Sequence, residues 1–150
     1  MYDRIYYEDV KTQLIEIFEY GQDMLPGIDI EWMIKTYLKS EHRKHVEEGM
    51  PYYISQLGSV VIRDMLKGTN YPTGGRSIES YGDALYWMGM VYNYLFFKYD
   101  IPCSKLIDLI TVSDMLKQYV TMHETGLDHT AEHLYEVFIE KDKSSPKLKA

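Results

Sequence analysis

The sequence contains a single cysteine, Cys103, and only five prolines. One cysteine excludes an intramolecular disulfide and a zinc site built from several cysteines, so the fold must be stabilised by an apolar core. A chain of 150 residues is long enough to bury such a core as one domain. The first ten residues mix acidic and tyrosine side chains and lack the basic patch and apolar run of a signal peptide, so we expect a cytoplasmic protein.

A long hydrophobic run is also missing. The longest apolar stretch extends from Ala84 to Phe97 and is interrupted only by Gly89 and Asn93. A transmembrane helix needs about 20 apolar residues, so this shorter stretch predicts a helix of a soluble protein. Because a helix that is apolar on every side must be buried on every side, we predict that residues 80–99 form the central helix of a bundle.

Apolar residues at helical spacing predict further helices, and no alternating pattern indicates a strand apart from a short extended piece near residues 1–7. We therefore expect an all-α bundle of six or seven helices over residues 1–143, followed by a disordered basic tail at 144–150. A loop dense in turn-forming residues is predicted at 69–77. The predicted helices cover residues 10–20, 30–49, 51–67, 80–99, 105–110 and 114–123, and a last one starts near Asp128 or Thr130.

Several residues are suited to end or cap these helices. Gly21 is expected to end the first helix and Asp29 to cap the second. Ser80, followed three residues later by Asp83, resembles a capping box for the central helix. Two further serines, Ser104 and Ser113, precede apolar segments and predict N-caps there, whereas Gly58 and Ser59 within the third helix predict a close approach to a neighbouring helix.

The charge of the chain is strongly uneven. The net charge is −7, but residues 1–140 carry −10 and the last ten residues carry +3. An acidic body repels nucleic acid, because nucleic-acid binding depends on Lys and Arg, so direct nucleic-acid binding is not expected. The charge favours a protein partner with a basic surface, although an acidic surface also serves solubility alone.

Fifteen tyrosines are unusually many for a chain of this length. A tyrosine buries a large ring but its hydroxyl needs a hydrogen-bond partner, so tyrosines suit interfaces and the edge of a core. Arg76, at the end of the predicted loop, could hold a carboxylate of the chain or of a partner. The residues predicted to bind a partner are Tyr2, Tyr6, Tyr7, Tyr52, Tyr53, Arg76 and Tyr81.

Residues 129–133 match the pattern H-x-x-E-H of some zinc peptidases. His129 and His133 lie one helical turn apart and could ligate zinc, with Glu132 activating a water. Such a site needs a third protein ligand, usually a carboxylate from a later helix, and here the nearby His123 or Glu136 would have to substitute. An exposed helix start with ordinary polar residues explains the pattern more simply, so we expect no metal and no cofactor and keep zinc hydrolysis as an alternative.

Two other groups of polar residues suggest no site. The basic residues at 42–45 are followed by Glu47 and Glu48, which cancel their charge, so we expect a solvated helix end with local ion pairs. Residues 68–77 lack the lysine, the spacing and the preceding strand of a phosphate-binding loop.

The segment from Val61 to Tyr94 contains a hydrophobic-Arg-Asp helix, a loop, and the aromatic run from Ala84 to Gly89. In these features it resembles a group of small helical proteins of Gram-positive bacteria and their mobile elements. A Tyr/Phe-His pair of that group is replaced here by Met122-His123. Members resemble antitoxins or accessory proteins encoded beside a toxin, and the resemblance implies a similar role without catalytic residues.

Together these features predict a non-enzymatic, antitoxin-like regulator that binds another protein through an acidic, tyrosine-rich surface. One alternative is an inhibitor from a phage or mobile element that mimics nucleic acid with surface carboxylates. The other is the zinc hydrolase at His129, Glu132 and His133.

Overall fold

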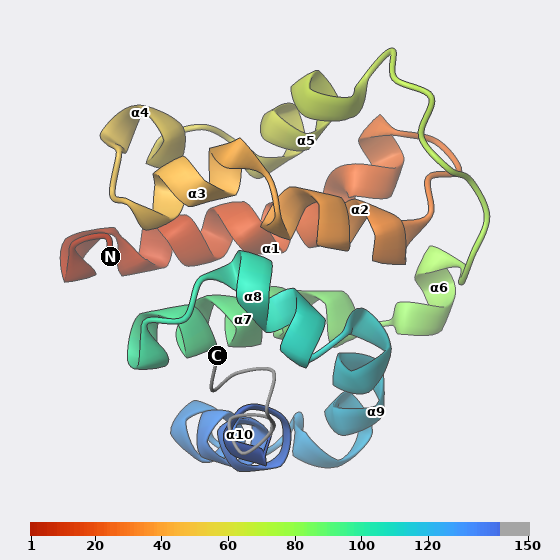
Figure 1. Cartoon of the computed structure of the whole chain (residues 1–150). Coiled ribbons are helices and arrows are strands. Elements are labelled where there is room, and N and C mark those ends of the chain that lie inside the picture. The colour runs from red at the N-terminus through yellow and green to blue at the C-terminus, as the bar shows by residue number, and fades with distance from the viewer. Residues whose placement is uncertain (142–150) are drawn as a thin grey trace.

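The computed structural model describes residues 1–141, and within them the chain forms helices joined by loops, without a strand (Figure 1). The predicted all-α class is therefore confirmed. The elements are η1 (Arg4–Tyr6), α1 (Tyr7–Met24), α2 (Ile30–Leu38), α3 (Glu41–Glu47), α4 (Pro51–Ile54), α5 (Gly58–Leu66), α6 (Ile78–Tyr81), α7 (Ala84–Tyr99), α8 (Cys103–Leu109), α9 (Val112–Met122), α10 (Leu127–Leu134) and the π-helical η2 (Tyr135–Glu140). The predicted domain end at 143 and the basic tail lie outside the described residues.

Helices α1 and α7 form the centre of the structure together. They pack against each other more extensively than any other pair, and α1 also contacts α2, α4 and α5 while α7 contacts α8, α9 and α10 (Figure 1). Gly89 makes the close approach possible, because a Cβ atom there would lie 3.0 Å from the Ile15 Cα. None of the helices in residues 1–141 is both long and apolar enough to cross a membrane.

The predicted central helix exists, but it begins later than expected. Ser80 belongs to α6, and Gly82, with φ of 53°, separates α6 from α7. The Ser80 hydroxyl donates to the Ser77 carbonyl, and no side chain caps α7, so the predicted capping box is wrong. Most of α7 is buried as predicted, although Tyr86 is exposed.

The first helix is longer than predicted at both ends. The N-terminal residues form η1 instead of an extended piece, and α1 starts at Tyr7. Gly21 does not end the helix, which continues to Met24. A Cβ atom at Gly21 would lie 2.3 Å from the Met33 sulfur on α2, so a larger residue there would require the end of the Met33 side chain to move.

The predicted second and third helices are each split in two. Asp29 caps α2 as expected by accepting from the Trp32 N–H at 3.2 Å. Ser40 then caps a separate helix, α3, and the extended conformation of Leu57 separates α4 from α5. These two breaks, together with the break at Gly82 between α6 and α7, explain why the described residues contain ten α-helices where six or seven were predicted.

Neither Ser104 nor Ser113 caps a helix. Pro102 precedes α8 without a side-chain cap, and Thr111 caps α9 through a capping box with Asp114. The N-cap of α9 is Thr111 and not Ser113 because two reciprocal hydrogen bonds form there. The Thr111 hydroxyl accepts from the Asp114 N–H, and the Asp114 carboxylate accepts from the Thr111 N–H.

The last predicted helix starts at Leu127, one residue after Gly126, and continues into η2. Neither Asp128 nor Thr130 is its N-cap, so that prediction is wrong. The Asp128 carboxylate instead accepts hydrogen bonds from Tyr94 and Lys98, which attach α10 to α7.

The loop between α5 and α6 is confirmed and is fixed near its middle. Residues Ile28 and Thr73 form an isolated antiparallel bridge. The Asp29 N–H donates to the Pro72 carbonyl at 2.9 Å. The Tyr71 hydroxyl donates to the Pro26 carbonyl in the α1–α2 turn at 3.2 Å. The second half of the loop therefore follows this turn, whereas Gly68 to Asn70 are exposed.

Candidate functional site

The side chains predicted to bind a partner lie in different parts of the molecule, with α4 and α6 far apart (Figure 1). Tyr2 and Tyr81 are buried in the core, so the expectation that they are exposed is wrong. Arg76 is exposed, and Tyr52 is the most exposed tyrosine of the set at 71 %. The remaining three are half-buried: Tyr6, Tyr7 and Tyr53.

The pattern at residues 129–133 lies on α10. His129 is exposed, His133 is half-buried, and the Glu132 carboxylate is 3.4 Å from the Lys98 ammonium. Residues 1–141 contain no group of three or more His, Cys, Asp or Glu side chains that could hold a metal ion. The third ligand that the zinc alternative requires is thus not found in this part of the chain.

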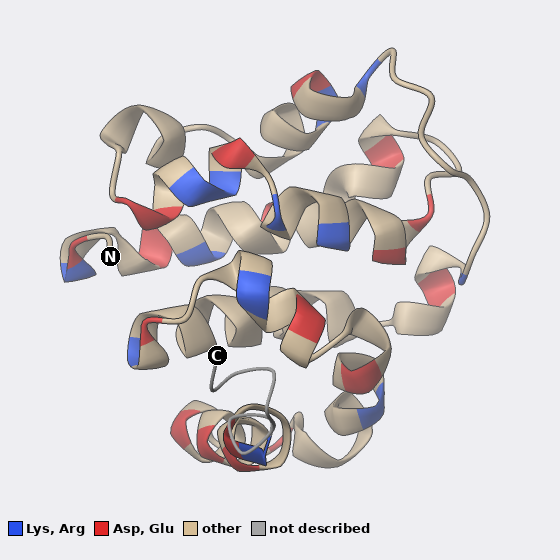
Figure 2. Ribbon diagram, viewed as in Figure 1, with Lys and Arg blue, Asp and Glu red and all other residues tan. Residues whose placement is uncertain are grey.

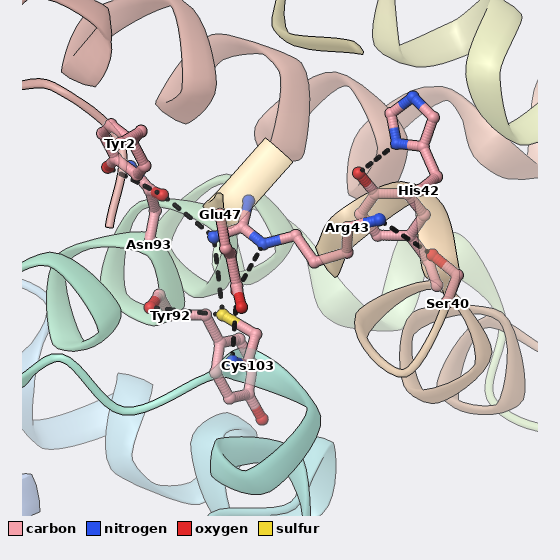
Figure 3. A network of polar contacts seen from close by, with 9 residues as sticks. Tyr2, Ser40, His42, Arg43, Glu47, Tyr92, Asn93 and Cys103 are labelled. Atoms are coloured by element: carbon pink, nitrogen blue, oxygen red, sulfur yellow. Dashed lines mark hydrogen bonds and ion pairs between the residues drawn. The ribbon is translucent and has the colours of Figure 1, made fainter. Parts of the chain in front are cut away.

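Arg43, expected on a solvated helix end, is instead completely buried, so that expectation is wrong (Figure 3). Its Nε donates to the Glu47 carboxylate at 2.7 Å, and its Nη2 donates to Asn93 Oδ1 at 3.1 Å. The Tyr2 hydroxyl donates to the same Asn93 oxygen, and the Cys103 N–H donates to Glu47. This network connects α3, α7, α8 and the N-terminal segment.

The electrostatics of this network favour a structural role. Burial raises the pKa of the Cys103 thiol well above its usual range, so the sulfur stays protonated and is a poor nucleophile. Burial also raises the pKa of Tyr2 to about 12, although Arg43 acts in the opposite direction. For Arg43 itself, burial opposes the charge, but the Glu47 carboxylate keeps its pKa above the ordinary value. Arg43 therefore remains charged and depends on Glu47 for compensation.

A second buried polar residue, Gln13 on α1, fixes the segment between α3 and α5, residues 50–57, which we call the connector. Gln13 is 2 % exposed, and its Nε2 donates to the carbonyls of Tyr53 at 2.7 Å and Gln56 at 2.9 Å. His42 adds a third attachment, because its Nε2 lies 2.8 Å from Gln56 Oε1 while its Nδ1 lies 3.0 Å from the Tyr37 hydroxyl. The connector is therefore held in place by side chains of α1 and α3.

The connector displays large apolar side chains to solvent. Tyr52 is 71 % exposed, Leu57 63 % and Met50 39 %. The Tyr52 ring is supported at its edge by Tyr53, with the ring centroids 5.2 Å apart. We call Met50, Tyr52 and Leu57 the connector surface. Exposed apolar side chains on a fixed backbone are typical of protein-binding surfaces.

A pocket of about 330 Å³ lies between α1 and the connector. Gln13 lines it, and the Gln13 Oε1 atom is buried without a hydrogen-bond partner among the described residues. Such an acceptor costs about 1–3 kcal/mol when it is left unpaired. Among residues 1–141 no Lys or Arg lines this pocket, and the lining residues are Asp9, Thr12, Gln13, Glu16, Ile54, Ser55, Gln56 and Leu57.

Gly58 allows α5 to begin directly against the wall of this pocket. A Cβ atom at Gly58 would collide with the Gln13 carbonyl oxygen and would lie 2.7 Å from the Glu16 Cβ. The close approach predicted at Gly58 is therefore confirmed.

The sequence interpretation included Tyr52 and Tyr53 but missed Gln13. A signal was present, because Gln13 lies between Val10, Leu14 and Ile17, which form the apolar face of α1. A polar side chain on such a face must find buried partners, and in this fold they are backbone carbonyls of the connector.

Comparisons of the chain with protein-family models, with curated proteins and with solved structures gave no match. The function of the protein is therefore inferred from its own geometry.

Proposed function

We propose that this protein is a non-enzymatic regulator that binds another protein through the connector surface, in the manner of an antitoxin. The observation that supports the proposal is the exposure of Tyr52 and Leu57 on a segment that Gln13 and His42 hold in place. A backbone fixed before binding loses less conformational entropy on association, so more of the contact energy is retained as affinity.

The charge around the connector surface favours a partner with a basic surface. Asp9 and Glu16 line the same pocket as Leu57, and no Lys or Arg of the described part of the chain lines it with them. Aromatic and apolar side chains flanked by carboxylates suit a partner that combines an apolar centre with Lys or Arg at its rim.

The carboxylates are less suited to mimicry of nucleic acid. Asp and Glu residues occur on most of the helices, and Lys and Arg lie between them (Figure 2). A mimic needs carboxylates that follow one face as phosphates follow a strand, so the distribution favours the connector surface over this alternative.

The proposal can be tested by affinity capture from the native host, with the wild-type protein and two variants as bait. In Tyr52→Ala/Leu57→Ser the connector surface is removed, whereas Val120→Ser changes a side chain that is 73 % exposed on α9. We expect a basic protein that the wild type and Val120→Ser retain and the double variant loses. Titration calorimetry with that protein should show at least about a 30-fold weaker Kd for Tyr52→Ala, since an aromatic anchor contributes about 2 kcal/mol or more.

The changed residues are exposed, so the free energy of unfolding should stay within about 0.5 kcal/mol of the wild type for Tyr52→Ala and confirm that it folds. A wild-type protein that retains no partner, or a partner that the double variant still binds with unchanged affinity, would contradict the proposal.

A further inference from the structure

The pocket between α1 and the connector collects hydrogen-bond acceptors. Asp9, Gln13 and Glu16 follow one another at four and three residues along α1, so they lie on one face of the helix. Asp9 and Glu16 therefore flank Gln13 along this face of the helix. No Lys or Arg among the described residues lines the pocket to neutralise the two carboxylates.

The orientation of the Gln13 carboxamide is determined by its contacts. The Nε2 atom donates to two backbone carbonyls, and a reversed amide would place Oε1 against these acceptors. Oε1 is therefore the end without a partner among the described residues, in a side chain that is 2 % exposed. A buried acceptor beside two carboxylates calls for a group that is cationic and donates several hydrogen bonds.

We infer that this pocket binds a guanidinium group, supplied by an arginine side chain of the protein partner. The inference rests on the proposed function for the source of the arginine. A guanidinium carries five N–H donors in a planar fork and can bond carboxylates and a carbonyl at once, whereas the lysine ammonium is a compact, strongly hydrated charge. Ile54 and Leu57 in the lining offer apolar contact to the methylene groups of the arginine.

The test is a titration of the ¹⁵N-labelled protein with n-propylguanidinium chloride at constant ionic strength, followed by two-dimensional NMR. We expect saturable shifts of the Gln13 side-chain amide and of the backbone amides of Gln56 and Leu57. The neutral isostere n-propylurea should produce none of these shifts, and n-butylammonium should bind at least threefold more weakly.

Variants of α1 make the test specific for the pocket. Asp9→Asn/Glu16→Gln should weaken propylguanidinium binding at least tenfold. Asp23→Asn, which changes an exposed carboxylate of the same helix outside the pocket, should alter it less than twofold. Unchanged spectra away from the pocket would show that both variants are folded.

Shifts that do not saturate, that propylurea or n-butylammonium reproduces equally, or that the double variant retains would overturn the inference. Failure of the proposed function gives a different result. If propylguanidinium does not bind while capture of the partner still depends on Tyr52, only the guanidinium site is wrong. If propylguanidinium binds as expected and no partner is captured, the proposed function is wrong and the pocket remains a guanidinium site.

Discussion

Arg43 and Gln13 are both buried polar side chains that join distant segments, but their surroundings differ. Arg43 is a charge that the Glu47 carboxylate compensates inside the protein. Gln13 is neutral, is bonded at its nitrogen and lines a pocket, and its oxygen has no partner among the described residues. Leaving a buried charge uncompensated costs far more than leaving one amide oxygen unpaired. A neutral buried amide can therefore be kept for a ligand at a cost that a marginally stable domain tolerates.

The largest effect should come from breaking the Arg43 region. We expect Glu47→Ala to lower the free energy of unfolding by about 3–5 kcal/mol, because it leaves the buried Arg43 charge unpaired. Urea denaturation measures the change. The double variant Arg43→Met/Glu47→Leu, which removes both charges, should recover part of the loss. A loss below about 1 kcal/mol for Glu47→Ala would show that Arg43 does not need this partner.

A smaller loss is expected where α5 begins against α1. Gly58→Ala should destabilise the protein by about 1–3 kcal/mol, because the added methyl group collides with the Gln13 carbonyl. The neighbouring change Ser59→Ala is the control and should stay within about 0.5 kcal/mol in the same denaturation experiment. If the two changes alter the free energy of unfolding equally, the helices accommodate the added methyl group at Gly58 without loss of stability, and the prediction is wrong.

The smallest effect should appear as a pH dependence of the connector. Burial lowers the pKa of His42 below its ordinary value of 6.5. As the pH falls, His42 is therefore protonated in the unfolded chain at a higher pH than in the folded protein. The stability that neutral His42 contributes is present above about pH 6.5 and is lost as the pH falls below it. Urea midpoints at pH 7.5 and 5.5 should differ less in His42→Gln than in the wild type. His129→Gln, which changes an exposed histidine, is the control. If it reduces the difference between the two midpoints as much as His42→Gln does, the assignment of the pH dependence to His42 is wrong.

Much of the fold could be predicted because it follows from local patterns. The apolar run of α7, the Asp29 cap, the loop at 69–77 and the close approach at Gly58 depend on residues adjacent in sequence. The breaks at Ser40 and Leu57 could not be predicted in this way, because residues 39–48 contain neither Gly nor Pro and the apolar spacing of residues 53–66 continues across Leu57. Only the packing of the resulting short helices decides where the chain turns.

The burial of Arg43 depends on one of these breaks. Glu41, Lys44 and Glu48 surround it in sequence and are exposed, so the segment reads as a solvated surface. Once α3 starts at Ser40, the four-residue spacing turns Arg43 and Glu47 inward together. Their partners Asn93 and Cys103 are 50 or more residues away, which no local pattern connects.

The candidate site also combines a residue that the sequence indicates locally with one whose role depends on distant contacts. Tyr52 could be selected from the sequence only as one of several tyrosines, because aromatic residues often anchor interfaces. Gln13 could not be assigned a role, because the carbonyls that it binds are 40 and 43 residues further along the chain. The pocket exists only after α1 and the connector meet.

The bridge between Ile28 and Thr73 has a practical consequence for experiments on this protein. It anchors the second half of the α5–α6 loop, so the exposed stretch that ends at Asn70 can be lengthened without pulling on α6. A biotinylation peptide inserted directly after Asn70 would attach the molecule to a sensor chip through the α5–α6 loop, which lies apart from α4 (Figure 1). Immobilised in this way, the protein would keep Tyr52 accessible to an analyte in flow.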